Sequence, residues 1–378
     1  MIELAVTSFN LIEEAIRSGG PEAGLNLIVH KFEEEKNYPL LFEARMMQRR
    51  HALGLPLVQI GSIDDVPEDK RAAYERAFTE SAREIGSLFL ADGQIPRAWP
   101  YFRAIGDSAP VASAIERLDA PNEELDRVIE IALEERVNPR KGFELMLAHY
   151  GICRAITYFE QYPDPKSREE CIALLVRTLH HELVENLKRA ITQREGSAAD
   201  TKNIPALIAG RDWLFGDLDY YADTSHVIAV IRFALDLHET EPLRLALEIC
   251  RYGDHLSHNF KYRVDPPFED VYRDHAKYLE ALLGENEDAA IDHFRKKAPE
   301  GIGPAQVLVA LLVRLKRYRE AIQLSLDHLG EVPPEQLACP SVLQLCQLAG
   351  DYDLLRKLAR ERGDLLSFVA ANFRPQSQ

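Results

Sequence analysis

The 378-residue sequence contains only five cysteines, and none of them forms a close Cys-x-x-Cys pair. An odd, scattered set of this kind predicts buried free thiols in a reducing compartment and argues against a disulfide framework. Long hydrophobic runs are also lacking, since the longest, from Val307 to Val313, is far too short to cross a bilayer. The first residues carry glutamates and no basic stretch, so a signal peptide is not expected. These absences predict a cytoplasmic protein without a membrane segment.

Positive charge is scarce. The chain has 45 Lys and Arg against 61 Asp and Glu, which gives a formal net charge of -16. Such a surface repels a phosphate backbone, and because no local basic stretch stands out, nucleic-acid binding is not expected. The motifs of other common sites are missing too: no G-x-G-x-x-G follows a strand, and neither a phosphate-binding G-x-x-x-x-G-K-[ST] nor a G-x-S-x-G elbow occurs.

Alternating β-branched runs are nearly absent, and almost every segment has a helical period. Phe9, Ile12 and Ile16 recur on one side of a helix, a Gly pair then ends it, and Pro21 suits the first turn of the next. Breaks rich in Gly, Pro and Asp recur along the chain with pairs of helical segments between them. Because the chain is longer than one core usually grows, we expect an all-α array of helix hairpins or several domains.

One segment carries a recognisable order of residues. Between Ser81 and Pro110 the sequence has an apolar-Gly pair, an aromatic, a small residue, a second aromatic and a proline: Ile85-Gly86, Phe89, Ala98, Phe102 and Pro110. This order resembles the tetratricopeptide repeat of about 34 residues, with Ala82 where the family has Trp. We expect Gly86 and Ala98 to let two antiparallel helices approach closely. Phe89 and Phe102 would fill the space next to the following hairpin, and Pro110 would end the second helix.

Looser copies of the pattern follow in the last third of the chain: Tyr278, Ala281, Ala290 and Phe294, and then Leu312, Tyr318, Ala321 and Pro333. Tyr352 lies 34 residues after Tyr318, which is one repeat length. The resemblance covers residues 74–110 well and 270–363 loosely, and it implies an α-α superhelix, or solenoid. We therefore expect N-terminal helices in 1–73, a tetratricopeptide-like hairpin in 74–120, a central region in 121–265 and tetratricopeptide-like repeats in 266–378.

The central region departs from the repeat pattern. Its helices look longer, at 141–162 and 167–196, and seven of the twelve histidines lie between His149 and His258. His149 shares an apolar stripe with Ile152 and Ile156, which fits either a core histidine or a group that lines an interior groove.

A short motif in the second long helix suggests a metal site. His181, Glu182 and Glu185 spell H-E-x-x-E, which resembles the H-E-x-x-H of zinc metallopeptidases with Glu in place of the second His. On a helix His181 and Glu185 would point the same way toward a cation, with Glu182 as a base. The alternative is a chance match on an acidic helix, and His180 lies on the more buried stripe.

Further polar residues follow at helical spacing. Asp223 or Thr224 would cap a helix that begins near Ser225, so that Asp223 and His226 are either a cap alone or a cap with a binding site among nearby aromatics such as Tyr220. Further on, Cys250, Asp254 and His258 align at i, i+4 and i+8. Several polar groups on core faces of one region imply a network, a groove or a metal.

Two functions remain open at this stage, and no cofactor is firmly predicted. The first is a scaffold that binds a protein or peptide in a polar groove that includes His149, Tyr220, Asp254 and His258. The second is a metal-dependent hydrolase that holds a divalent transition metal. Its ligands would be His181, Glu185, Asp223 and His226, and Glu182 would be its base.

Overall fold

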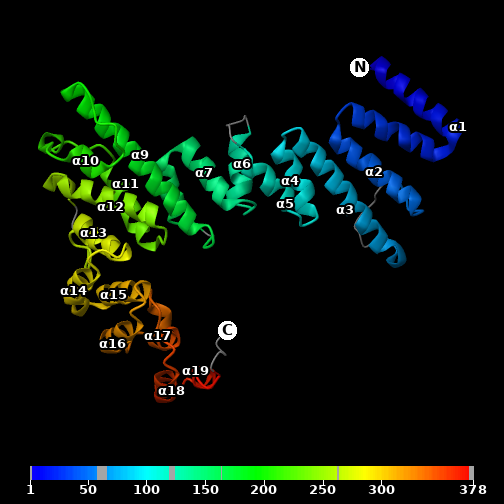
Figure 1. The fold of residues 1–378 in the computed structure, drawn as a ribbon. Coiled ribbons are helices and arrows are strands. Elements are labelled where there is room, and N and C mark those ends of the chain that lie inside the picture. Colours follow the sequence, from blue (N-terminus) through cyan, green and yellow to red (C-terminus); the bar gives the residue numbers. More distant parts are fainter. Residues whose placement is uncertain (1, 58–65, 119–123, 163, 262–263, 374–378) are drawn as a thin grey trace. The chain divides into compact units, whose positions relative to one another are not determined.

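The computed structural model describes the chain except for residues 1, 58–65, 119–123, 163, 262–263 and 374–378 (Figure 1). The described residues form nineteen α-helices with short 3-10 turns and no β-strand, which confirms the all-α prediction. No helix in this part of the chain combines the length and the apolar character that a bilayer span requires. The chain divides into two compact units, Met1–His149 and Tyr150–Gln378, which we call the first and the second unit.

The first unit is built from seven helices: α1 (Ile2–Glu34), α2 (Tyr38–Ala52), α3 (Glu68–Ala91), α4 (Ile95–Ala104), α5 (Ala109–Glu116), α6 (Leu125–Leu133) and α7 (Pro139–Tyr150). Helices adjacent in sequence from α1 to α6 pack on one another, and α1 to α6 share one apolar core. In α1 the backbone leaves helical geometry at Gly20, where φ is 76°, so the predicted stop before Pro21 is confirmed as a kink.

The predicted hairpin corresponds to α3 and α4. Gly86 is buried on α3, and a Cβ atom there would lie 2.6 Å from Cε2 of Phe102, so the close approach expected at this glycine is present. Ala98 and Phe102 are fully buried. The role predicted for Pro110 is wrong, because α4 already ends at Ala104 and Pro110 lies in the first turn of α5. A proline fits there since the N–H that it lacks has no partner in a first turn.

The second unit contains the remaining helices: α8 (Ile152–Phe159), α9 (Arg168–Glu195), α10 (Ile204–Ile208), α11 (Thr224–Phe233), α12 (Thr240–His255), α13 (Val271–Leu282), α14 (Glu287–Lys297), α15 (Ile302–Arg314), α16 (Tyr318–His328), α17 (Val342–Leu348), α18 (Tyr352–Glu361) and α19 (Leu365–Ala370). The 28-residue α9 contacts α8, α10, α11 and α12, which makes it the central element of this unit.

Only one of the two long helices expected in the central region is continuous. The second is α9, as predicted. The first is interrupted at Gly151, whose φ of 80° ends α7 before α8 begins. His149 therefore lies on a different helix from Ile152 and Ile156, and the apolar stripe predicted for these three residues does not exist.

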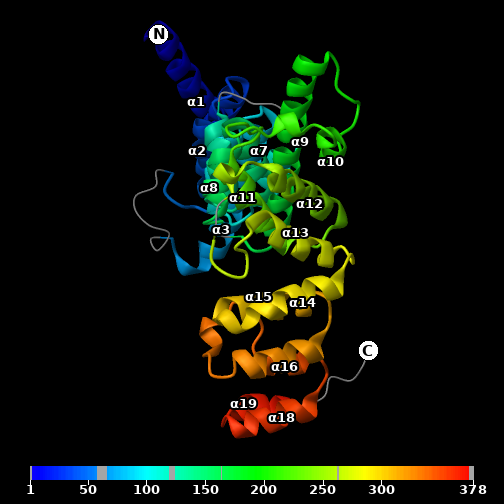
Figure 2. The same ribbon diagram turned by 90° about the vertical axis from the view of Figure 1, so that its left-hand side faces the viewer.

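From α13 onward each helix contacts the next, and these helices enclose a common core. Figure 2 shows α14, α16 and α18 in successive layers of this part of the unit. Tyr278 and Phe294 pack edge to face with ring centroids 5.8 Å apart. Tyr318 and Tyr352, which the sequence spaced one repeat apart, are each the first residue of a helix, α16 and α18.

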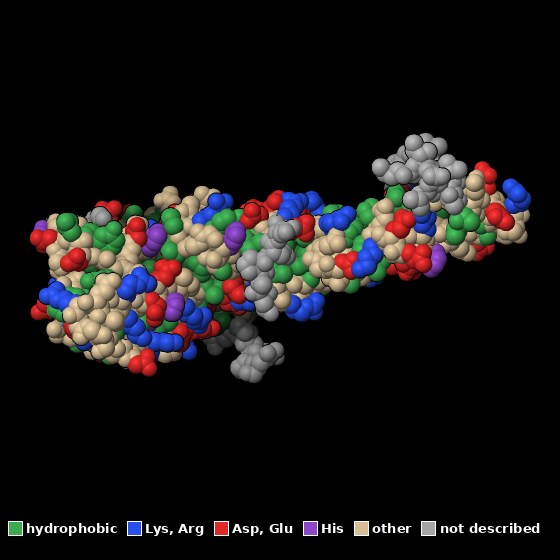
Figure 3. All heavy atoms as spheres, turned by 90° about the horizontal axis from the view of Figure 1, so that it is seen from above, with side chains coloured by type: hydrophobic (Ala, Val, Ile, Leu, Met, Phe, Trp, Pro, Cys, Tyr) green, Lys and Arg blue, Asp and Glu red, His purple; other side chains and the backbone are tan. Residues whose placement is uncertain are grey.

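Charged side chains of both signs are interspersed over the face drawn in Figure 3. Acidic side chains are close to basic ones there, and this face carries no continuous basic band. Many acidic side chains are paired with basic ones, such as Glu84 with Arg45 at 2.9 Å and Glu160 with Arg232 at 2.8 Å. The net charge of -16 is the excess of acidic over basic residues.

Candidate functional site

The helix α9 supplies one wall of the candidate site. Its buried face is a regular apolar stripe that includes Leu183, Leu187 and Ile191. Because side chains three and four positions apart share a helix face, residues 186, 189, 190 and 193 form a strip beside that buried stripe. This strip contains Asn186, Arg189 and Gln193, three side chains that carry several hydrogen-bond donors.

The opposite wall is the segment that precedes α11. The backbone N–H of Tyr221 donates to the hydroxyl of Tyr252, which is fully buried on α12, over 2.8 Å. On its other side the carbonyl of Tyr221 accepts a hydrogen bond from Nδ2 of Asn186, also over 2.8 Å. The segment is therefore tied to α12 and α9 at one residue, which fixes its backbone next to the strip.

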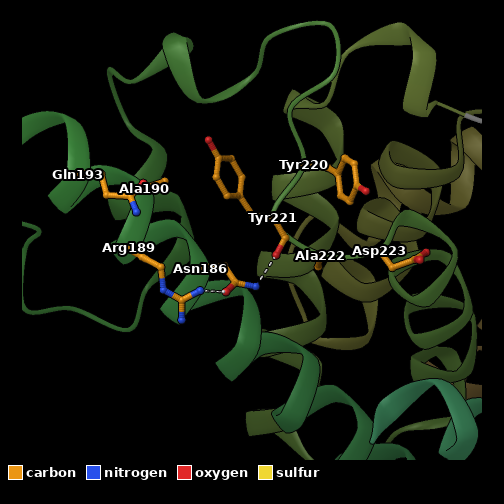
Figure 4. A pocket seen from close by; sticks show the side chains of 8 residues that line it. All are labelled: Asn186, Arg189, Ala190, Gln193, Tyr220, Tyr221, Ala222 and Asp223. Carbon is orange, nitrogen blue, oxygen red and sulfur yellow. Dashed lines mark hydrogen bonds between the residues drawn. The ribbon is translucent and has the colours of Figure 1, made fainter.

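A cavity of about 440 Å³ lies between the two walls. Its lining residues are Asn186, Arg189, Ala190, Gln193, Tyr220, Tyr221, Ala222 and Asp223. Figure 4 shows Asn186 reaching from α9 to the backbone of Tyr221, with the guanidinium of Arg189 beside it. Nη1 of Arg189 donates to Oδ1 of Asn186 over 3.2 Å. The ring of Tyr220 packs edge to face on Phe260, with centroids 5.3 Å apart.

The charges around the cavity are of both signs. Arg189 is exposed, and among the described residues no carboxylate pairs with it. Burial, and secondarily the charge of Asp219, raises the pKa of the Tyr221 hydroxyl, which stays a neutral hydrogen-bonding group. The hydrogen bond from Ser225 lowers the pKa of Asp223 below its ordinary value, so this carboxylate is ionised at neutral pH. The cavity thus offers both donors and acceptors to a polar ligand.

Asp223 is the N-cap of α11. Its Oδ1 accepts from the backbone N–H of Ser225 at 2.8 Å and from the Ser225 hydroxyl at 2.6 Å. Capping explains why an acid stands here, because the first N–H groups of a helix lack intrahelical partners. Asp223 also lines the cavity, whereas the half-buried His226 does not.

The residues predicted to hold a metal are not brought together. His181, Glu182 and Glu185 are all exposed on α9, because the neighbouring His180, Leu183 and Leu187 occupy its buried face. In the part of the chain that the structure describes, no group of three or more His, Cys, Asp or Glu side chains is arranged to hold a metal ion. The four predicted ligands are therefore not assembled as a metal-holding group among the described residues, and the role of Glu182 as a base stays a prediction.

The buried histidine on α9 is His180, as predicted. Its Nε2 lies 2.9 Å from Oε2 of Glu248 on α12, and the same carboxylate accepts from Ile204 N at 2.9 Å and from Asn203 Nδ2 at 2.6 Å. Burial acts to raise the pKa of Glu248, but the hydrogen bonds outweigh it and the pKa lies below its ordinary value. This network fastens the start of α10 to α9 and α12, which is a structural task.

Three other predicted groove residues lie elsewhere. His149 is largely exposed, and its Nε2 lies 3.4 Å from Oδ1 of Asp126. Asp254 accepts from Nε of Arg273 at 2.7 Å. His258 is not on α12, which ends at His255, so the expected i, i+4, i+8 alignment is interrupted before it.

Of the predicted groove residues, only Tyr220 lines the cavity. Sequence reasoning missed Asn186, Arg189 and Gln193, although their spacing on an apolar helix is a signal that could have found them. Tyr221, one of the aromatics near Asp223 in the sequence, also lines the cavity. No family model, no curated protein and no solved structure matches this chain.

Proposed function

We propose that the chain is a protein- or peptide-binding scaffold of tetratricopeptide-like helical repeats. The support for the repeat type is local: Gly86 and Phe102 pack as that resemblance implies, and Tyr318 and Tyr352 begin helices one repeat apart. From α1 to α6 and from α13 onward each helix contacts the next, which suits a stacked array whose grooves serve recognition in such proteins. The five free cysteines agree with a reducing, cytoplasmic location.

The observation that carries the proposal is the lining of the cavity beside α9. Tyrosine and arginine dominate the energetic centres of protein interfaces, and both are present here in Tyr220, Tyr221 and Arg189. The amide of Gln193 can donate to a peptide carbonyl and accept from a peptide N–H. Because the hydrogen bond between Asn186 and Tyr221 already fixes the two walls, little ordering is needed when a ligand binds.

The size of the cavity indicates the size of the ligand. A volume of about 440 Å³ accommodates a few residues of a peptide, within the range of about 300–1,000 Å³ that is typical of ligand sites. We therefore expect a short extended segment of a partner protein to bind here.

The proposal is tested with peptides selected on the full-length chain from a displayed random library. Binding of the selected peptides is measured by fluorescence polarisation for the wild type and for Arg189→Ala. We expect the dissociation constant to rise about tenfold, because truncation of a central arginine costs more than about 1 kcal/mol. Arg76→Ala is the matched control, since Arg76 is an exposed helical arginine in the first unit.

Two results would contradict the proposal. One is a selection that yields no peptide above background. The other is a set of peptides that bind Arg189→Ala and Arg76→Ala with the same affinity, which would mean that the peptides do not bind in the cavity. The melting temperatures of both variants are also measured. Values equal to that of the wild type show that both variants are folded.

A further inference from the structure

The helix α19 is apolar on both of its sides. Its inner side packs on α18, where the ring of Phe368 lies 5.0 Å from the guanidinium carbon of Arg360, and Ala371, the residue that follows the helix, is fully buried. Its outer side and the turn that follows leave four large apolar side chains in solvent: Leu365 (77% exposed), Leu366 (84%) and Val369 (54%) on the helix and Phe373 (74%) after it. We call these four residues the α19 face. A helix that is apolar all round is ordinarily covered on all sides.

The α19 face is large enough to matter energetically. Large aliphatic and aromatic side chains present on the order of 100 Å² each, so the four together expose about 400 Å². That area equals the largest apolar patch of a typical monomeric protein, and such patches commonly mark an interaction site. Two copies of the face would bury about 800 Å² of apolar surface and some polar rim, close to the total of about 1,000 Å² that a specific interface needs.

The charge of the segment that carries the face permits a second copy of the same chain to approach. Residues 350–373 contain four acidic and four basic side chains: Asp351, Asp353, Glu361 and Asp364, and Arg356, Lys357, Arg360 and Arg362. This segment is therefore neutral in a chain with a net charge of -16. Two copies can approach here without the repulsion that the acidic remainder would cause. A two-fold axis would bring the same patch of each copy together.

We propose that the α19 face is the contact surface of a symmetric homodimer. The contact lies on α19 and is separate from the cavity beside α9, so this inference does not rest on the peptide-binding proposal. Figure 2 shows α19 next to α18. Because the apolar area reaches the total of about 1,000 Å² only together with the polar rim, we expect a dimer that dissociates in the micromolar range.

The test is the molar mass of the full-length chain, measured by sedimentation velocity at concentrations from about 1 to about 100 µM. The wild type is expected to shift from monomer to dimer across this range. Leu366→Glu should remain monomeric at every concentration, because it places a charge at the centre of the face. Leu218→Glu is the matched control, since Leu218 is 80% exposed on a loop.

Phe9→Glu is a second control, because Phe9 is an exposed aromatic, 65% exposed on α1, far from α19 in the sequence. A dimer that only Leu366→Glu abolishes, with unchanged circular dichroism, supports the proposal. A monomeric wild type at about 100 µM, a dimer that survives in Leu366→Glu, or a dimer lost in Phe9→Glu or Leu218→Glu would each overturn it. A monomer that binds an apolar dye through Leu366 would show that the face stays exposed in solution and would overturn the homodimer.

Discussion

His275 shows how one buried side chain can make stability depend on pH. It is 3% exposed on α13, and its Nδ1 donates to the carbonyl of Val271 over 2.6 Å, while Nε2 has no hydrogen-bond partner among the described residues. The ring is stacked on Phe268 at 4.2 Å between centroids. Burial lowers the pKa of His275 from 6.5 to about 4; Arg232 acts in the same direction, and Val271 and Asp274 oppose it.

His275 is therefore neutral in the folded chain at a pH where it would be protonated in the unfolded chain. The stability that the neutral His275 ring gives the folded chain is fully present above pH 6.5. This stability is lost as the pH falls from 6.5 to about 4, because over this interval the unfolded state binds a proton that the folded state does not. We expect the unfolding free energy to fall by about 3 kcal/mol more over this interval in the wild type than in His275→Phe. Urea titrations at several pH values measure the difference.

The control for this prediction is His255→Phe. Nδ1 of His255 also contacts the carbonyl four residues earlier, Arg251 O at 2.9 Å, and its ring also lies beside a phenylalanine, but the side chain is exposed. Its pH dependence should equal that of the wild type. A His275→Phe variant with the slope of the wild type would mean that burial of this ring does not set the effect.

Sequence reasoning at the residue scale worked where the pattern was local. It placed His180 on the buried side of α9 and assigned a capping acid to the start of α11, since both follow from helical spacing and first-turn chemistry. It could not find Glu248, the partner of His180, because 68 residues separate the two in the chain. The packing of α9 on α12 brings these two residues together.

At the scale of helix pairs, Gly86 determines how closely α3 and α4 approach. A methyl group at this position would lie 2.6 Å from Cε2 and 2.9 Å from Cδ2 of Phe102, whose ring is fully buried and has no room to move away. We expect Gly86→Ala to destabilise the protein by about 1–3 kcal/mol, as overpacking of a core usually does. The measurement is the midpoint of urea unfolding at constant m-value.

Gly303→Ala provides the comparison. Gly303 also lies in a helix, α15, but a Cβ atom there would meet no atom within 4 Å. Alanine has the higher helix propensity, so this variant should match the wild type or exceed it by up to about 1 kcal/mol. Equal destabilisation by both substitutions would show that the contact with Phe102 is not the cause.

Element boundaries were predicted less well than element type. The expected helix over 141–162 contains Gly151, whose left-handed φ of 80° interrupts it, and α4 ends at Ala104 well before Pro110. Both segments have apolar residues at helical spacing, so periodicity alone cannot locate the break. A glycine inside such a pattern is compatible with either outcome, and the packing of each half decides.

At the scale of the whole chain, each unit encloses an apolar core of its own. Phe102 is fully buried in the core of the first unit and Phe294 in that of the second. We expect thermal unfolding in two transitions, because units with separate cores unfold as separate cooperative blocks. Phe102→Ala should lower the melting temperature of one transition and Phe294→Ala that of the other, each through a loss of about 3–5 kcal/mol.

Differential scanning calorimetry of the full chain resolves the transitions, and the two alanine variants serve as controls for each other. A single transition that both substitutions shift equally would contradict this prediction, since it would mean that the two cores melt together. The division between residues 149 and 150 falls inside the predicted central region of 121–265. No composition change marks it in the sequence.

The linear pattern of residues was enough to predict an all-α protein, close packing of the α3–α4 hairpin through small residues, and an acidic cap at the start of a helix. Each of these follows from interactions within about one turn or one hairpin, which a linear pattern records. The packing of distant segments was needed to place Asn186, Arg189 and Tyr221 at one cavity and to leave an apolar face of α19 uncovered. It also leaves His181 and Asp223 outside any metal-holding group of three or more ligands among the described residues. These features depend on which helix faces pack together although they are far apart in the chain. The free energy of that packing comes from contacts between distant segments, so the residue spacing within one segment does not determine it.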